Sequence, residues 1–134
     1  MFQQNRTPLT GFRTLVIGLG PPREQLAECI NARCLCMFET GLVEEVRGIL
    51  AMGFPRTSKA LESIGYREAL LHIEGEISYE EAVELTQAAT RQYAKRQRTW
   101  FRREANVHWL STFGNQIETI ENAKRLAVSF LKAF

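Results

Sequence analysis

The segment SYEEAVELTQAATRQYAKRQRTWFRR, from Ser78 to Arg103, decides the fold because it predicts one long helix. Ser78 and Glu81 have the spacing of an S-x-x-E capping box, in which each side chain bonds the other residue's backbone N–H at a helix start. At about 100° per residue, one side of this helix collects most of its apolar side chains. We expect this apolar stripe to be buried: Ala82, Leu85, Ala89, Tyr93 and Trp100.

A second stripe, on the opposite side of the same predicted helix, is basic. Its members are spaced i, i+4, i+7 and i+11, and they are Arg91, Lys95, Arg98 and Arg102. The net charge of +2 does not identify a partner, but six of the 17 Lys and Arg residues fall between Thr90 and Glu104. The residues alone leave two interpretations open, an ordinary solvated helix face or a surface that holds a polyanion.

Two arginines occupy positions where an apolar side chain is expected. Arg96 projects between Tyr93 and Trp100, and Arg33 lies in a predicted stripe with Leu26, Ile30 and Met37. A guanidinium keeps its charge, so burying it without a partner is costly. Arg96 must therefore meet a carboxylate, an aromatic face or an anion. An internal ion pair with Glu68, Glu74 or Glu84 is one interpretation, and an anion bound in a cleft is the other main one. Forked donors suit phosphate, and we hypothesise that Arg33 and Arg96 meet a diphosphate or a nucleic-acid backbone in a shared cleft.

The remaining segments predict a mainly α-helical chain with a few short strands, of the α/β class. Helices are expected at about 22–39, 42–54 and 117–134, with one or two short helices around Gly65, and strands at 12–19 and 106–110. We expect one domain over 1–134, with residues 1–11 as an N-terminal linker. The apolar run at 15–17 is typical of a strand covered on both faces, and such a strand needs sheet neighbours, of which the predicted strand at 106–110 could be one. Part of the sheet is therefore expected in missing chain or in a partner.

The sequence predicts no membrane span, no metal site and no catalytic triad. No apolar run approaches the roughly 18 residues of a membrane span, and the first residues lack the apolar segment of a signal peptide, so we expect a soluble cytoplasmic protein. The cysteine spacing C-x4-C-x-C fits no common zinc pattern, which indicates reduced thiols. His72 and His108 have no partner at metal-ligand spacing. IGLGPPRE, at 17–24, follows a predicted strand but is not a G-x-x-x-x-G-K-[ST] phosphate loop, so we interpret it as a strand-to-helix turn.

Several motifs follow one another in a fixed order: PPREQLAECINAR, GLVEEVRGIL, IGYRE, EGEIS, TRQYAKRQRTWFR and VHWL. In this order and spacing they resemble the C-terminal part of bacterial tRNA dimethylallyltransferases, from Phe2 to about Leu110. The resemblance implies transfer of a dimethylallyl group from its diphosphate to the adenosine just 3′ of the tRNA anticodon. It implies a three-layer fold like that of P-loop kinases, Mg²⁺ as cofactor, and an anticodon stem-loop as partner, with the target base flipped into a channel.

The resemblance also implies roles for single residues. Arg33 matches a diphosphate-binding arginine. The reaction channel is implied for Lys95, Arg96, Gln97, Thr99 and Trp100. RNA binding is implied for Arg91, Lys95, Arg98 and Arg102. Cys29 and Cys36 depart from the pattern, because the family usually has arginine and aspartate at these positions.

The family's phosphate loop and the catalytic aspartate that follows it are absent from this sequence. We therefore expect the chain to be the C-terminal portion of the enzyme, with no catalytic residue of its own, and to be inactive alone. A stand-alone helical RNA-binding or interaction module without catalysis is the alternative. The sheet edge left open in such a portion could also pair two copies into a homo-oligomer.

Overall fold

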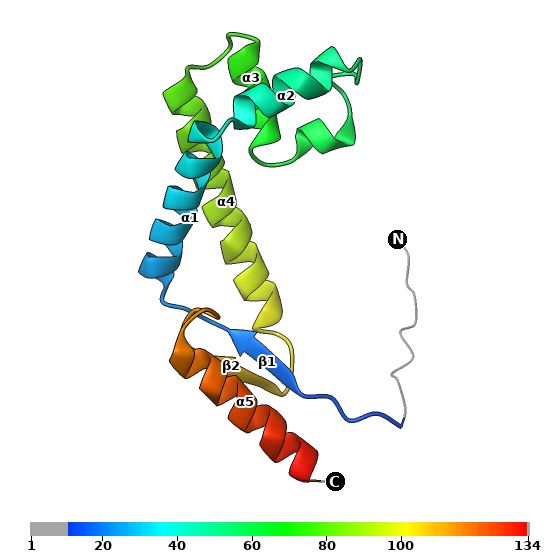
Figure 1. The fold of residues 1–134 in the computed structure, drawn as a ribbon, viewed down its shortest axis with the longest axis vertical. Helices are drawn as coiled ribbons and strands as arrows, with labels where there is room; N and C mark the ends of the chain where they lie inside the picture. Colours follow the sequence, from blue (N-terminus) through cyan, green and yellow to red (C-terminus); the bar gives the residue numbers. More distant parts are fainter. Residues whose placement is uncertain (1–10, 134) are drawn as a thin grey trace. The chain divides into compact units, whose positions relative to one another are not determined.

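The computed structural model of the chain describes residues 11–133 (Figure 1). These residues fall into two compact units, one formed by 21–104 and one by 11–20 together with 105–133. The prediction of one domain over 1–134 stays a prediction, and the predicted linker lies outside the described residues except for Gly11. Within residues 11–133, no helix has both the length and the apolar character needed to cross a bilayer.

The larger unit, 21–104, is helical. Its elements are α1 (Arg23–Glu39), α2 (Leu42–Ala51), the 3₁₀ helix η1 (Lys59–Glu62), α3 (Tyr66–Ile73) and α4 (Tyr79–Phe101). The capping box at the start of α4 is confirmed, because the Glu81 N–H donates to Ser78 Oγ at 3.1 Å and the Ser78 N–H donates to Glu81 Oε2 at 2.7 Å. Helix α2 ends earlier than predicted, at Ala51, where Gly53 follows with a φ of +87°.

The core of this unit lies where α2, η1 and α3 pack against the first turns of α4 and the end of α1 (Figure 1). Its buried apolar residues are Phe38, Leu42, Val43, Val46, Leu61, Ala69, Ala82 and Val83. Beyond Thr86, no residue of α4 is fully buried. The second half of α4 runs beside α1, so this half of the helix is supported on one flank by its own unit.

The predicted buried stripe of α4 is wrong beyond its first turn. Leu85, Tyr93 and Trp100 are 47%, 48% and 54% exposed. The reason is that α1 meets a different flank of α4, one formed by smaller side chains: Cys34 Sγ of α1 lies 3.6 Å from Thr90 Oγ1. Arg96 is exposed, like Leu85, Tyr93 and Trp100, so its position carries no burial penalty within unit 21–104.

The smaller unit contains the two described strands and the last helix. β1 (Val16–Leu19) and β2 (Val107–Leu110) pair in parallel, with Val16 opposite Val107 and Leu19 opposite Leu110. This confirms the predicted pairing, although β1 begins four residues later than expected. Val16 and Leu19 are 43% and 50% exposed, so the described residues do not cover β1 on both faces as predicted. Helix α5 (Ile117–Lys132) follows β2.

A close contact fixes the two strands against each other. The Trp109 ring lies over Gly18, where an added Cβ would come within 2.7 Å of Trp109 Cε3 and 2.8 Å of Val107 Cγ1. Glycine is therefore required at position 18 by space rather than by backbone conformation. Together, the described helices and this short sheet confirm the predicted class, mainly α with a few short strands.

Candidate functional site

A groove lies between α1 and the second half of α4, with a volume of about 290 Å³. We call it the α1–α4 groove. Its apolar lining consists of Leu26, Ala27, Ile30 and Ala94, all half-buried. The polar and basic part of its lining consists of Arg23, Arg91, Lys95, Arg98 and Thr99. The groove thus combines an apolar surface with four cationic side chains.

Arg91 is held in place by a neutral partner. Its Nη1 donates to Asn31 Oδ1 of α1, and Gln87 Nε2 donates to the Asn31 backbone carbonyl at 3.1 Å. An amide oxygen fixes the guanidinium without neutralising it, and it leaves the other N–H donors of the fork available. The sequence therefore orients this charge and keeps it unbalanced.

Arg98 lies among like charges. The pKa of Arg98 lies below its ordinary value because partial desolvation disfavours its charged form and because Arg102 and Arg23 repel it. The ion pairs among residues 11–133 are formed elsewhere, by Arg47, Arg56 and Arg67 with glutamates. Cations gathered without counter-charges produce a positive potential that favours an incoming anion.

Of the predicted basic stripe, Arg91, Lys95 and Arg98 line this groove. Arg102 caps the C-terminal end of α4 and is exposed one turn further along. Arg23 was missed by the sequence reasoning. Its spacing of three, four and seven residues from Leu26, Ala27 and Ile30 places all of them on one helix face, and this signal could have identified it.

A second hollow, of about 530 Å³, lies along another flank of α4; it is an open surface depression, because all its lining residues belong to α4 or directly follow it. We call it the Trp100 cavity, and it is lined by Gln92, Lys95, Arg96, Thr99, Trp100 and Arg103. The Arg96 guanidinium carbon lies 5.8 Å from the centroid of the Tyr93 ring, a cation–π distance. Four of the five residues assigned to the reaction channel thus line one cavity, and Lys95 and Thr99 line both hollows. Gln97 is exposed and does not line either one.

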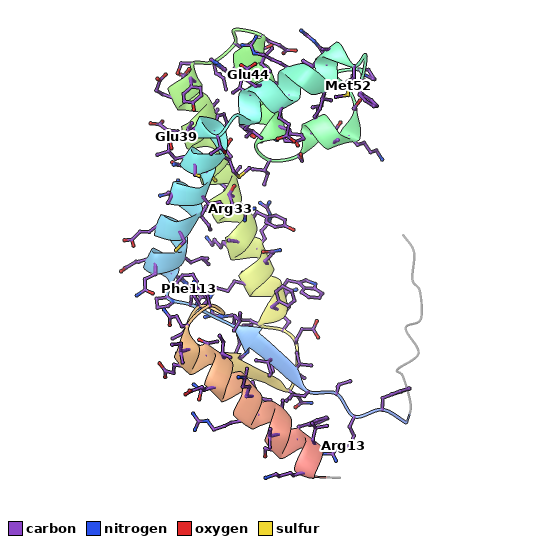
Figure 2. The ribbon with its side chains drawn as sticks, in the orientation of Figure 1. Arg13, Arg33, Glu39, Glu44, Met52 and Phe113 are labelled. Carbon is purple, nitrogen blue, oxygen red and sulfur yellow. The ribbon has the colours of Figure 1, made fainter. Side chains whose placement is uncertain are left out.

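Arg33 is separate from both hollows. It lies midway along α1, is exposed, and is absent from the lining of the α1–α4 groove and of the Trp100 cavity (Figure 2). Within unit 21–104, Arg33 and Arg96 line no common hollow, and a shared cleft that the family's N-terminal part would complete stays a prediction. Neither arginine is paired with a glutamate in the described part of the chain, so the alternative of an internal ion pair is not met.

The described residues do not fit a magnesium ion. Mg²⁺ is held by carboxylate and other oxygen ligands. Residues 11–133 contain no group of three or more His, Cys, Asp or Glu side chains that could hold a metal, and the basic residues of both hollows would repel a cation.

The fold is shared with a class of solved transferases named for tRNA. The tRNA delta(2)-isopentenylpyrophosphate transferase of Staphylococcus epidermidis matches 89% of this chain with a TM-score of 0.77 and 38% identity. The full-length tRNA isopentenylpyrophosphate transferase of Bacillus halodurans matches 94% with a TM-score of 0.74 and 32% identity. The match spans 39% and 44% of those two chains.

The chain belongs to the IPP transferase family, whose model matches residues 1–104. A tRNA dimethylallyltransferase of Solibacter usitatus is 51% identical over 131 residues, which are 98% of this chain and 43% of the relative. One of Koribacter versatilis is 47% identical over 94% of this chain and 41% of the relative. The chain thus spans about two fifths of the length of these curated relatives.

Proposed function

We propose that this chain is the tRNA-contacting part of a tRNA dimethylallyltransferase, which moves a dimethylallyl group from its diphosphate to the adenosine 3′ of the anticodon. The observation that carries the proposal is the basic lining of the α1–α4 groove, which has no internal counter-charge, in a chain of the IPP transferase family. The same groove could serve RNA binding in a stand-alone module, and the activity experiment below separates the two functions.

The basic stripe contacts RNA phosphates in this proposal. Arg91, Lys95, Arg98 and Arg102 recur every three or four residues along α4, and at about 1.5 Å per residue they cover about 16 Å of helix. A row of cations of this length suits a chain of phosphates. Its contribution to affinity comes from counterion release and weakens steeply as salt is added.

In this proposal, side chains that line the Trp100 cavity form one wall of the reaction channel. They are Lys95, Arg96, Thr99 and Trp100, with Gln97 beside them. The leaving diphosphate gains negative charge as the C–O bond breaks, so fixed cations near it lower the barrier. Arg96 is the cation of this cavity best held, because it lies against the Tyr93 ring. Arg33 would contact the diphosphate only from a cleft completed by residues outside unit 21–104.

We propose that this chain alone does not catalyse the transfer. Its 134 residues contain no G-x-x-x-x-G-K-[ST] phosphate loop and no aspartate that follows one. The family's Mg²⁺ would then be held by other residues. A cytoplasmic location and a homo-oligomer formed through the exposed edges of β1 and β2 complete the proposal, and light scattering on the purified chain tests the oligomer.

The binding proposal is tested by titrating an unmodified tRNA transcript with the chain at several salt concentrations. One variant changes Arg91, Lys95, Arg98 and Arg102 to Ala. Its control changes four exposed cations elsewhere to Ala, with the same loss of charge: Arg47, Lys59, Lys124 and Arg125. The salt slope is the slope of log K for tRNA binding against log salt concentration. Each lost phosphate contact should lower it by about 0.7 to 0.9, so we expect the stripe variant to lower it by about 3 in total and the control to change it by less than 1. Equal binding by the wild type and the stripe variant would refute the assignment.

The activity proposal is tested by incubating the chain with labelled dimethylallyl diphosphate, Mg²⁺ and tRNA. No label should reach the tRNA from the chain alone, whereas binding to tRNA should be retained. Label at the adenosine 3′ of the anticodon would overturn the proposed inactivity. If neither the chain nor a longer protein that contains it transfers label, the stand-alone binding module is favoured.

A further inference from the structure

The α1–α4 groove has an apolar lining as well as cations, and the basic stripe alone does not explain the apolar part. A surface that only holds phosphates needs cations, yet this groove has Leu26, Ala27, Ile30 and Ala94 on its inside. Apolar surface left open between α1 and α4 is stabilised when an apolar group covers it. The ligand that fits is therefore an anion that carries a flat or compact apolar group.

The cations around the groove come from both helices. Arg23 lies in the first turn of α1 and Arg98 on α4, and the two guanidinium groups are close enough to repel each other. Neither forms an ion pair with a carboxylate among residues 11–133. An anion between the two guanidinium groups would relieve this repulsion. A phosphate bound between Arg23 and Arg98 would therefore complement the charge of the groove.

RNA supplies both parts of such a ligand when a nucleotide is unpaired. In a duplex the base faces are stacked and only base edges and the backbone are accessible, whereas an unpaired nucleotide offers its base face. The volume of about 290 Å³ is small for a ligand site, which suits a single base. The basic stripe continues past the groove to Arg102, further than one small diphosphate reaches, which favours a phosphate chain as the occupant.

We propose that the α1–α4 groove is a subsite for one unpaired nucleotide of the bound RNA, with its base against the apolar lining and its phosphate between Arg23 and Arg98. This inference rests on the proposed function and deepens it. The groove has no aromatic side chain in its lining, so the base is held by apolar contact rather than by stacking, and little preference among bases is expected.

Two substitutions test the subsite without touching the basic stripe. Ala94→Leu fills the groove and leaves every charge in place, and Ala88→Leu is its matched control, because Ala88 lies on the same helix but lines a different hollow. We expect Ala94→Leu to weaken binding of a single-stranded oligonucleotide at least threefold, with duplex RNA binding and the salt slope unchanged. Arg23→Gln should lower the salt slope for single-stranded RNA by about 0.7, one phosphate contact, and the exposed-site control Arg47→Gln should not.

A third measurement uses the wild-type chain and so does not depend on the folding of a variant. Backbone amide NMR shifts on adding a trinucleotide RNA should include Ala27, Ile30 and Ala94. Shifts confined to α4, or wild-type binding by both Ala94→Leu and Arg23→Gln, would overturn the subsite while leaving the basic stripe intact. Loss of the stripe effect itself would instead refute the proposed function. Dimethylallyl diphosphate alone is the competing ligand. If it shifts the same groove amides at a lower concentration than the trinucleotide does, the assignment to RNA is overturned.

Discussion

Changing Asn31 to Asp tests whether Arg91 holds its charge ready for RNA. In the structure the Asn31 amide oxygen accepts a hydrogen bond from the Arg91 guanidinium, and the neutral amide leaves that charge unbalanced. Aspartate has nearly the same shape and presents an oxygen in the same place, but it is ionised above a pH of about 4. The substitution therefore turns an orienting contact into an ion pair.

The size of the effect follows from counterion release. Each phosphate contact contributes about 0.7 to 0.9 to the slope of log K against log salt, so neutralising Arg91 should lower the slope by that amount. Between 1 M and 0.1 M salt, this difference amounts to about a five- to eightfold loss of affinity, or about 1 kcal/mol, that appears only at the lower salt concentration. Stability should move the other way, because a partly exposed ion pair stabilises by about 0 to 1 kcal/mol.

The assay is tRNA binding by Asn31→Asp and by wild type across a salt series, with thermal unfolding measured on the same samples. The matched control is Asn122→Asp on α5, where Arg125 donates to the Asn122 amide oxygen in the same kind of pair but outside the basic stripe. An unchanged slope in Asn31→Asp, or an equal decrease in both variants, would refute the reasoning. A lower melting temperature in Asn31→Asp would show that the ion pair does not form.

Three further predictions concern stability. Gly18→Ala should destabilise the chain by about 1 to 3 kcal/mol in urea unfolding, because the new methyl group overlaps the Trp109 ring. Ser78→Ala should lower stability by about 1 kcal/mol in thermal unfolding, because α4 loses its N-terminal cap. The pKa of Tyr66 is raised by its hydrogen bond to Glu45, then by burial and by the charge of that carboxylate. Because the pKa is raised, the contact between Tyr66 and Glu45 stabilises the folded state fully below a pH of about 10, and this stabilisation is lost as pH rises through the higher folded-state pKa. The unfolding free energy of Tyr66→Phe should lack this pH-dependent component.

Each of these three has a clear contrary outcome. Gly48→Ala, at a helix position with open space around it, should stabilise rather than destabilise, and similar losses at positions 18 and 48 would contradict the packing explanation. Wild-type stability in Ser78→Ala would mean that the capping box contributes little. The same alkaline loss in wild type and in Tyr66→Phe would assign that loss to other groups.

Much of the local structure was predictable because it depends on neighbouring residues. The start of α4 at Ser78 followed from the capping box, and the pairing of β1 with Val107–Leu110 followed from two short apolar runs. The buried face of α4 was not predictable, because helical periodicity identifies the most apolar face of a helix and not the face that a neighbouring helix contacts. The contact with α1 instead uses Thr90 and other small side chains, which leaves Trp100 exposed in the described residues.

The candidate site was predicted only in part for a similar reason. The basic stripe and most of the channel residues lie on one helix, so their spacing alone brings them together at the two hollows. Asn31 acts across the interface between α1 and α4, and no pattern within one helix identifies which turn of α1 faces Arg91. Arg33 was selected because it interrupts an apolar pattern; Leu26, Ile30 and Met37 of that pattern are half-buried, whereas Arg33 itself is exposed.

The parallel pairing of β1 with β2 also constrains the order of folding. The two strands are separated by roughly ninety residues, and joining the ends of a flexible chain of that length opposes folding by about 4 kcal/mol of loop entropy. Once α1 and α4 have docked, Arg23 and Arg98 line the same groove, and only short segments remain between that groove and the strands. The effective loop then shrinks to roughly fifteen residues, which reduces the entropic barrier by about 1.5 kcal/mol. The α1–α4 pair is therefore expected to form before the sheet, so a destabilising change in the α1–α4 contact should slow the pairing of β1 with β2.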